Sequence, residues 1–220
     1  MTRDEMARML DHSVLKPEAV EADIVAGMEV VRTWPGGYSC VQPCWVSLAA
    51  RLLAGTPVGV ISVVGFPHGC DRGEAKARAA EIAVADGAAE IDLVMNFGML
   101  RSGRAAEVGK DLEAVVRAVP GIPVKVILES AALSAEEARL ACRLAVAAGA
   151  AFVKTSTGFH PAGGASVEAV RLMRESVGPA FGVKASGGIR NLADVLRMIE
   201  AGANRIGTSA SAAILAALPG

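Results

Sequence analysis

The sequence predicts a single (β/α)8 TIM barrel, an α/β fold in which eight parallel strands alternate with helices. Short runs rich in β-branched residues alternate with Ala-rich amphipathic stretches along all 220 residues, and no Pro- or Ser-rich linker separates them. A repeating unit of roughly 25 residues suits eight units in a chain of this length. Helical stretches also end repeatedly in an Ala-Gly-Ala turn before a strand, as in ADGAAEIDL, AAGAAFVKT and EAGANRIGT.

Strands are expected where short apolar runs stand between turn residues. The predicted strands are Met9–His12, Ser39–Val41, Val58–Val63, Glu90–Val94, Val124–Leu128, Ala151–Lys154, Gly182–Ala185 and Arg205–Ile206. The predicted helices include Glu74–Asp86, Ala105–Val119, Ala135–Ala148, Ser166–Ser176 and Leu192–Ala201. Ser134 and Glu137 have the spacing of a capping box at one helix start. An open doubly wound sheet is the alternative, but it usually has fewer strands. We therefore expect one barrel domain over residues 1–220.

Composition excludes several classes of protein. Apolar residues make up 52% and charged residues 20% of the chain, which is enough to bury a core. The mean hydropathy is +0.41, but the long apolar runs are rich in Ala and Gly and are interrupted, as buried barrel segments are. The net charge of −1 gives no basic field for nucleic acid. The start, MTRDEMARML, has no apolar signal segment. We expect a cytoplasmic protein that binds neither membrane nor nucleic acid.

The cysteine and histidine residues predict no metal site and no disulfide framework. Cys40 and Cys44 have a CxxxC spacing, but no second Cys or His pair completes a zinc site. The histidines, at positions 12, 68 and 160, match no ligand spacing. Cys40 lies in a predicted strand with no base nearby, so we interpret it as a core residue. We expect neither a metal ion nor an organic cofactor.

The lysines point to chemistry. The chain has 16 Arg and only 6 Lys, yet three of the lysines lie in apolar strand-like runs, namely PVKVIL, AFVKTS and FGVKAS. Where only charge is needed, this chain uses Arg. Lysine differs from Arg because burial can lower its pKa into a range where the amine is a nucleophile or a base.

Lys154, in AFVKTSTGF, is the strongest candidate catalytic residue. The two-residue period of a strand places it at the strand end, facing the barrel interior together with Phe152. It is either a Schiff-base lysine or a lysine paired with a barrel carboxylate. Lys184, in FGVKASGGIRN, occupies the same place one strand further along. Its positive charge would lower the pKa of Lys154, so the pair of lysines favours the Schiff-base interpretation.

Asp92, in AEIDLVMN, supplies a carboxylate near the barrel mouth. It can hold Lys184 and relay a proton through water at the carbon–carbon bond that breaks. A simple ion pair with Lys125 or Lys184 is the alternative. Lys125 lies deeper in its strand, which favours a supporting ion-pair role. Asp11 and Lys16, in LDHSVLKP, are interpreted as structural residues.

A phosphate site is expected in the loops after the last strands. Barrels often bind phosphate after strands 7 and 8, through backbone N–H groups. Gly187 and Gly188 follow the first of these strands, the stretch from Gly207 to Ser209 follows the second, and Thr157 with Gly158 can close a third side. Arg190 either contacts the phosphate or caps a helix. The GFPHG turn, residues 65–69, implies little chemistry.

With these residues identified, the chain resembles the deoxyribose-phosphate aldolase family over nearly its whole length. The matching segments are LDHSVLKP, YSCVQPCWV, VVGFPHG, AAEIDLVMNFGML, VKVILES, FVKTSTGF, VKASGGIR and RIGTSAS. The resemblance implies reversible cleavage of 2-deoxy-D-ribose 5-phosphate into acetaldehyde and D-glyceraldehyde 3-phosphate, in deoxyribonucleotide breakdown. It also implies that Lys154 is the Schiff-base lysine, that Lys184 and Asp92 assist it, and that Gly187, Gly188, Gly207 and Ser209 line the phosphate pocket.

Two positions depart from the family pattern. Some members have a phosphate-binding Lys where this chain has Phe159. Some members end in a tyrosine thought to assist proton transfer, whereas the only tyrosine here is Tyr38 and the chain ends in AALPG. We expect water to supply that assistance if it is needed. Gln42, where Asn is usual, is treated as neutral.

Two other functions remain open. One is a barrel isomerase or another class I aldolase, for which a carboxylate base without a lysine pair would be expected. The other is a non-catalytic sugar-phosphate sensor, in which Lys154 would titrate near its usual value of about 10. In each case the ligands are small sugar phosphates, or sugar phosphates and aldehydes. The Ala-rich surface favours a homodimer or homotetramer.

Overall fold

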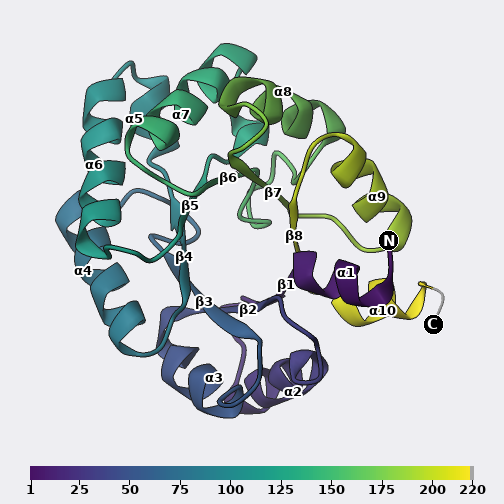
Figure 1. The fold of residues 1–220 in the computed structure, drawn as a ribbon. Coiled ribbons are helices and arrows are strands. Elements are labelled where there is room, and N and C mark those ends of the chain that lie inside the picture. The colour runs from purple at the N-terminus through teal and green to yellow at the C-terminus, as the bar shows by residue number, and fades with distance from the viewer. Residues whose placement is uncertain (219–220) are drawn as a thin grey trace.

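The protein is a closed barrel of parallel strands, described by a computed structural model for residues 1–218 (Figure 1). Each strand pairs in parallel with the next, and β8 pairs with β1. The strands are β1 (Leu10–Val14), β2 (Tyr38–Val41), β3 (Gly59–Val64), β4 (Glu90–Val94), β5 (Val124–Ile127), β6 (Phe152–Lys154), β7 (Gly182–Ser186) and β8 (Arg205–Thr208). The predicted barrel is confirmed. Only β4 matches its predicted strand at both ends; the other strand ends that differ do so by one residue, or by two at the ends of β1 and β8. Met9 belongs to a helix, and β8 continues to Thr208.

Helices surround the barrel (Figure 1). They are α1 (Arg3–Met9), α2 (Glu21–Val31), α3 (Val46–Leu52), α4 (Gly73–Ala85), α5 (Phe97–Arg101), α6 (Ala105–Ala118), α7 (Ala135–Ala147), α8 (Val167–Val177), α9 (Leu192–Glu200) and α10 (Ser211–Ala216), with short 3-10 turns at Pro43–Trp45 and Ser130–Ala132. The five predicted helices are confirmed to within one residue at each end. The predicted capping box is also present: Ser134 Oγ accepts from the N–H of Glu137, whose carboxylate accepts from the N–H of Ser134. Within residues 1–218, no helix is both long and apolar enough to cross a membrane.

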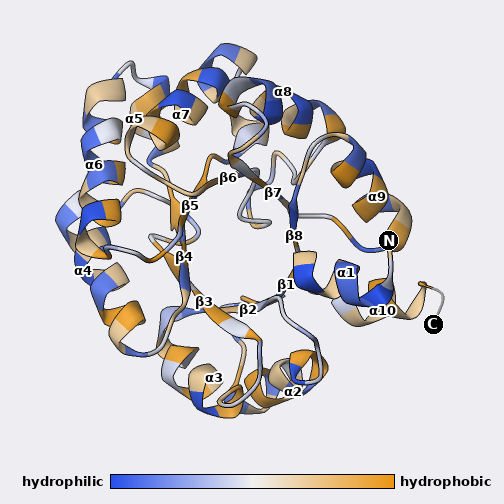
Figure 2. Ribbon diagram, in the orientation of Figure 1, coloured by the Kyte–Doolittle hydropathy of each residue, from blue (hydrophilic) through white to orange (hydrophobic). Residues whose placement is uncertain are grey.

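The larger apolar core lies between the barrel and the helices. Strand residues with outward-facing side chains pack there against the inner faces of the helices, and Figure 2 shows mostly hydrophobic strands beside helices with both hydrophobic and hydrophilic segments. Members of this outer core include Leu10, Ile91, Leu93, Val126, Val153, Val183 and Ile206 on strands and Ile24, Leu112, Val115, Val170 and Val195 on helices.

The barrel interior is built differently. Its apolar cluster is small and separate, and contains Leu15, Cys40, Ile61 and Val63. Near the strand starts, glycines face aromatic rings: a Cβ on Gly59 would approach the Tyr38 ring to 2.6 Å, and one on Gly182 would collide with the Phe152 ring. The remaining interior positions are largely charged. The strand register sets Lys184 directly beside Lys154, so both lysines project into this interior.

Candidate active site

A cavity of about 500 Å³ opens at the C-terminal ends of β1, β6, β7 and β8. This is the end at which barrel enzymes place their active sites. Asp11, Lys154 and Lys184 reach the cavity from the strands, and the residues after β6, β7 and β8 form its rim. The cavity therefore lies where the sequence patterns placed the predicted site residues.

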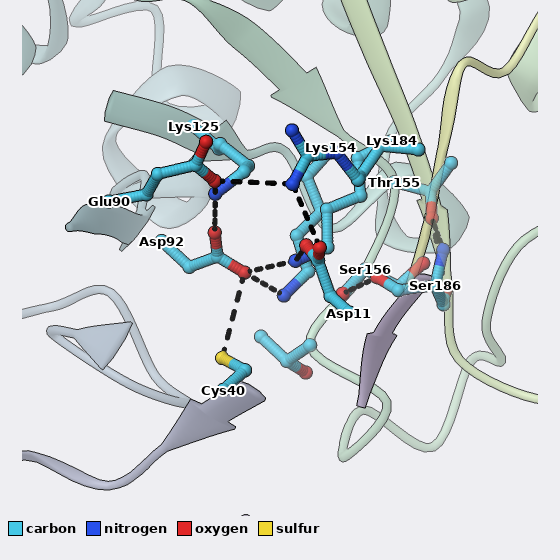
Figure 3. Close-up of polar contacts among 12 residues, drawn as sticks. Asp11, Cys40, Glu90, Asp92, Lys125, Lys154, Thr155, Ser156, Lys184 and Ser186 are labelled. Atoms are coloured by element: carbon cyan, nitrogen blue, oxygen red, sulfur yellow. Dashed lines mark hydrogen bonds and ion pairs between the residues drawn. The ribbon is translucent and has the colours of Figure 1, made fainter. Parts of the chain in front are cut away.

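Asp92 joins three lysines inside the barrel (Figure 3). Its Oδ2 atom lies 2.6 Å from Nζ of Lys154 and 2.7 Å from Nζ of Lys184. Its Oδ1 atom lies 3.0 Å from Nζ of Lys125. The structure thus brings together the predicted trio of Lys154, Lys184 and Asp92. It also gives Lys125 the expected ion pair.

Two further carboxylates and an arginine extend this network. Asp11 Oδ2 lies 2.5 Å from Nζ of Lys184, and Asp11 Oδ1 lies 2.9 Å from Nη1 of Arg205. Glu90 pairs with Lys125 and lies 3.4 Å from the same Nη1 atom. Asp11, interpreted from the sequence as structural, holds Lys184 and Arg205 and also lines the cavity. The sequence patterns missed Glu90 and Arg205, although the strand register alone places both on inward positions.

The pKa values of the two neighbouring lysines move in opposite directions. Burial lowers the pKa of Lys154, and the charge of Lys184 adds to this against the opposing carboxylate of Asp92. Burial alone would also lower the pKa of Lys184, but Asp11 and Asp92 outweigh it and raise that pKa. Burial would raise the pKa of Asp92, but Lys125, Lys154 and Lys184 hold it well below its usual range. Lys184 therefore keeps its proton, and Lys154 is the amine that loses its proton first.

This difference bears on the two interpretations of Lys154. It does contact a carboxylate, as the structural alternative requires. That carboxylate, however, is shared with two other ammonium groups and cannot neutralise all of them. A lysine that lies 3% exposed at the cavity with a lowered pKa is suited to nucleophilic attack on a carbonyl.

Glu129 shapes the loop after β6 and was not identified from the sequence. Its backbone is left-handed (φ 56°, ψ 54°), which costs a non-glycine residue of the order of 1–3 kcal/mol. Its buried carboxylate accepts from Thr157 Oγ1 at 2.6 Å and from Thr157 N at 3.2 Å. The loop carrying Thr157 and Gly158 is thus tied to the end of β5. A strand-end acid after VKVIL was the available signal, but nothing in the sequence shows its backbone conformation.

Glycines allow three loops to meet at the rim. Gly187 has φ +90°, and a Cβ there would lie 3.0 Å from Cα of Gly164 and 3.3 Å from Cα of Gly158. A Cβ on Gly164 would collide with the carbonyl of Gly187. Side chains would therefore separate the loops after β6 and β7. The sequence patterns singled out Gly158 and Gly187 but missed Gly164.

Several rim N–H groups are available to an anion. Within residues 1–218, the N–H groups of Gly158, Gly187, Gly188 and Ser209 donate to no other protein group, and all four residues line the cavity. Gly207 differs from expectation because it lies within β8, not in the loop after it. It also makes room for a lysine, since a Cβ there would lie 3.0 Å from Cε of Lys184.

Charged side chains at the rim include Lys16 and Arg190, which both line the cavity and are exposed. Lys16 therefore has more than the structural role expected of it, because it also lines the cavity. The N–H of Arg190 donates to Asp194 Oδ2 at 3.2 Å. Within the described chain, its guanidinium makes no contact that would cap a helix. Phe159 is 44% exposed at the same rim.

The GFPHG turn does not line the cavity but packs against a residue that does. Phe66 packs edge-on against Phe159, with ring centroids 5.3 Å apart. Lys76 fixes the turn: its Nζ donates to Gly69 O at 2.8 Å and contacts Asp111 at 2.7 Å. Lys76 is fully engaged on the outside of the barrel and does not line the cavity.

Cys40 and His12 both lie in surroundings that are typical of structural residues. Burial raises the pKa of Cys40 to about 12, so this core thiol is protonated 4.0 Å from Asp92. His12 faces away from the interior, and its Nδ1 lies 2.7 Å from Ser211 Oγ. In the part of the chain that the structure describes, no group of three or more His, Cys, Asp or Glu side chains is arranged to hold a metal ion.

The fold and the cavity define the class of protein: a (β/α)8-barrel enzyme with its cavity at the C-terminal mouth. Residues 38–217 match the family described as DeoC/LacD family aldolase, and the chain belongs to this family. It is an aldolase, a carbon–carbon lyase.

Named relatives agree over nearly the whole chain. Deoxyribose-phosphate aldolase 1 of Bacillus licheniformis is 50% identical over 215 residues, covering 97% of this chain and 96% of that protein. Deoxyribose-phosphate aldolase of Bacillus subtilis is 49% identical over 211 residues, covering 96% and 94%. The solved tetrameric deoxyribose phosphate aldolase of Aeropyrum pernix is 29% identical, with a TM-score of 0.88 over 98% of this chain and 91% of that one. The resemblance inferred from the motifs is confirmed.

Proposed function

We propose that this aldolase reversibly cleaves 2-deoxy-D-ribose 5-phosphate into acetaldehyde and D-glyceraldehyde 3-phosphate through a Schiff base on Lys154. The observation that carries the proposal is the lowered pKa of Lys154 at the cavity, beside Lys184, which keeps its proton. The relatives named deoxyribose-phosphate aldolase support the choice of substrate.

The reaction begins at Lys154. Its neutral amine attacks the C1 aldehyde of the ring-opened sugar, and loss of water gives an iminium ion. The positive iminium withdraws electrons from the neighbouring carbons. Lys154 supplies this electron sink itself, so the proposed mechanism uses neither metal nor organic cofactor.

Carbon counting places the cleaved bond between C2 and C3, because acetaldehyde keeps two carbons and the phosphorylated product keeps three. The C3 hydroxyl loses its proton to a water held by Asp92 and Lys184, and C3 becomes a carbonyl carbon. The electron pair of the C2–C3 bond moves to form the C1–C2 double bond of an enamine. After the phosphorylated aldehyde leaves, the enamine is protonated at C2, and water releases acetaldehyde and regenerates the Lys154 amine.

The rim binds the phosphate in this proposal. The available N–H groups of Gly187, Gly188 and Ser209 would donate to the phosphate, Thr157 and Gly158 would close the site, and Gly207 contributes by leaving space. These donors suit an anion. Phe159 stands where some family members carry Lys, so binding relies more on backbone donors and on nearby Arg190.

The proposed setting follows from the relatives. The Aeropyrum pernix enzyme is tetrameric, which supports a homodimer or homotetramer for this chain as well. We propose that the protein works in the cytoplasm, in deoxyribonucleotide breakdown.

The test is chemical trapping. Acetaldehyde and borohydride are added to the folded protein, and the modified peptide is mapped by mass. We expect a reduced ethyl adduct on Lys154. The matched control is Lys154→Arg, whose guanidinium keeps its own proton and cannot form the adduct.

An adduct on Lys184 or Lys125 would keep the aldolase chemistry and overturn the role of Lys154. No adduct on a folded protein would overturn the Schiff-base mechanism. Stabilisation by the sugar phosphate without any product would instead indicate a sensor, and isomerised product would indicate an isomerase.

A further inference from the structure

We propose that Arg205 is a positioning residue that sets the charge state of Lys154 from the N-terminal side of the barrel interior. This inference rests on the proposed function, because it concerns the amine that would form the Schiff base. Arg205 touches neither the cavity nor Lys154. It acts through the carboxylates that it shares with the lysines.

Charge counting inside the barrel leads to this inference. The interior network contains the carboxyls of Asp11, Glu90 and Asp92 and the basic groups of Lys125, Lys154, Lys184 and Arg205. Three negative groups thus face four basic groups, so one positive charge is in excess when all are ionised. A buried unbalanced charge is costly, and the cheapest relief is loss of one proton. Neutral Lys154 leaves three negative and three positive charges.

No other interior group can take up this role. Besides the network, β2 contributes Tyr38 and Cys40, whose pKa values are both raised chiefly by burial, so both side chains stay neutral. The inward residues of β3 are Gly59, Ile61 and Val63, which do not titrate. His12 faces outward. Within the described chain, the balance therefore depends on the network alone.

Arg205 is placed to supply a positive charge to this network. Its Nη1 atom bridges Asp11 Oδ1 at 2.9 Å and Glu90 Oε2 at 3.4 Å. Its guanidinium lies 4.5 Å from the Tyr38 ring centroid and 5.3 Å from that of Phe152. Burial alone would lower the pKa of Arg205, but the two carboxylates outweigh it, so the group stays charged.

The two bridged carboxylates lead to Asp92 by separate routes. Asp11 contacts Lys184, which contacts Asp92. Glu90 contacts Lys125, which contacts Asp92. Figure 3 shows both branches meeting at Asp92, the partner of Lys154. Without the positive charge of Arg205 the network would have a negative excess, and Lys154 is the group that would then hold a proton.

The test compares pH profiles of a charge series. Arg205→Met removes the positive charge, Glu90→Gln removes a negative charge, and the double variant Glu90→Gln/Arg205→Met restores the balance. Arg205→Lys is the matched control, since a single nitrogen makes both contacts and an ammonium can replace it. Two quantities are measured from about pH 5 to pH 10: kcat/KM for cleavage, and the initial rate of trapping acetaldehyde on Lys154.

We expect the acid limb of both profiles to shift to higher pH by about one unit or more in Arg205→Met, which lowers the rate on that limb about tenfold. The limb should shift to lower pH in Glu90→Gln and return close to its wild-type position in the double variant and in Arg205→Lys. A merely structural role predicts that the double variant is worse than either single variant, with no reversal of the pH shift.

Unmoved limbs in both single variants would overturn the inference, as would a double variant that keeps the full shift. If Arg205→Met does not fold, Glu90→Gln and the double variant still decide the question. Failure of the proposed function is separable: wild-type protein would then trap no acetaldehyde at any pH. Wild-type trapping with coincident profiles across the series would overturn this inference alone.

Discussion

The two cores of this barrel obey different rules. The outer core, between strands and helices, consists of fully buried aliphatic side chains such as Leu93 and Leu112. The inner core has a small apolar cluster and a network of seven ionisable groups. Apolar burial stabilises the fold by about 25 cal/mol per Å². Buried ion pairs contribute little net stability, because desolvation offsets their attraction.

The difference shows where stability and chemistry reside. The outer core holds the strands in register and so places the inner groups. The inner core uses that rigidity to keep Lys154 buried and next to Lys184, and the burial together with that neighbouring charge lowers the pKa of Lys154. Substitutions in the outer core should therefore change stability with little effect on chemistry, and substitutions in the inner core should do the reverse.

The largest effect is expected at Lys154. Lys154→Arg should reduce turnover to below about 1% of wild type, because a guanidinium cannot form the iminium. The variant should still fold, because the outer core supplies the stability. Steady-state cleavage measures the turnover, and thermal unfolding checks that the variant is folded. Lys110→Arg, at an exposed lysine, is the control and should keep full activity. Retention of more than about 1% turnover would contradict the role of Lys154.

The next effect tests the outer core. Leu112→Ala should lower the free energy of unfolding by about 2–5 kcal/mol, because it leaves a cavity at a fully buried position. The pH profile of the folded enzyme should stay unchanged. Denaturant unfolding gives the free energy, and Leu196→Ala, on an exposed side chain, should cost less than about 0.5 kcal/mol. A shifted pH profile in Leu112→Ala would show that the two cores are not separable.

A smaller effect is expected at the rim. Glu129→Gly relieves the left-handed backbone but removes the acceptor for Thr157. It should lower kcat/KM for the phosphorylated sugar about tenfold more than for unphosphorylated 2-deoxyribose, through a raised KM. Glu129→Gln keeps an acceptor oxygen and should restore most of the loss. Equal losses on both substrates would mean that Glu129 does not position the phosphate loop.

The smallest effect concerns His12, a polar exception in the outer layer. Burial lowers its pKa to about 4, below the unfolded value of about 6.5. The unfolded state therefore takes up a proton between these values while the folded state does not, so stability falls as the pH falls through that window. We expect a loss of about 1 kcal/mol between about pH 6.5 and pH 5.5, seen in denaturant unfolding. His12→Asn should remove this component, and an identical pH dependence in that variant would contradict it.

The fold and the centre of the site could be read from the sequence for a physical reason. Apolar runs with a two-residue period mark buried strands, and a lysine inside such a run stands out because its charge is costly there. Lys154 and Lys184 stand out in this way, and Asp92 stands out as an acid inside the run AEIDLVMN. The end of β8 was harder to predict, because Gly207 and Thr208 belong to the strand although their sequence is typical of a loop.

Other residues could not be read for equally physical reasons. Glu90 and Arg205 begin their strands, where a charged residue usually faces solvent. The two-residue period from Asp92 was the available signal for Glu90, whereas the orientation of Arg205 follows from its register beside Lys184. The contact between Glu129 and Thr157 joins positions 28 residues apart and depends on a left-handed backbone that no motif encodes. Gly164 matters only because another loop packs against it. The closing Pro219 and Gly220 of the AALPG tail lie outside the described residues.

The most direct test of the central claim is a titration of the lysines by NMR, with ¹³C label at Cε. The chain has only six lysines, and Lys154→Arg assigns the decisive signal by its loss. We expect the Lys154 signal to titrate below the usual value of about 10.4, while Lys184 stays protonated throughout. A Lys154 signal that titrates at or above the usual value would contradict an interior network that leaves this amine uncharged.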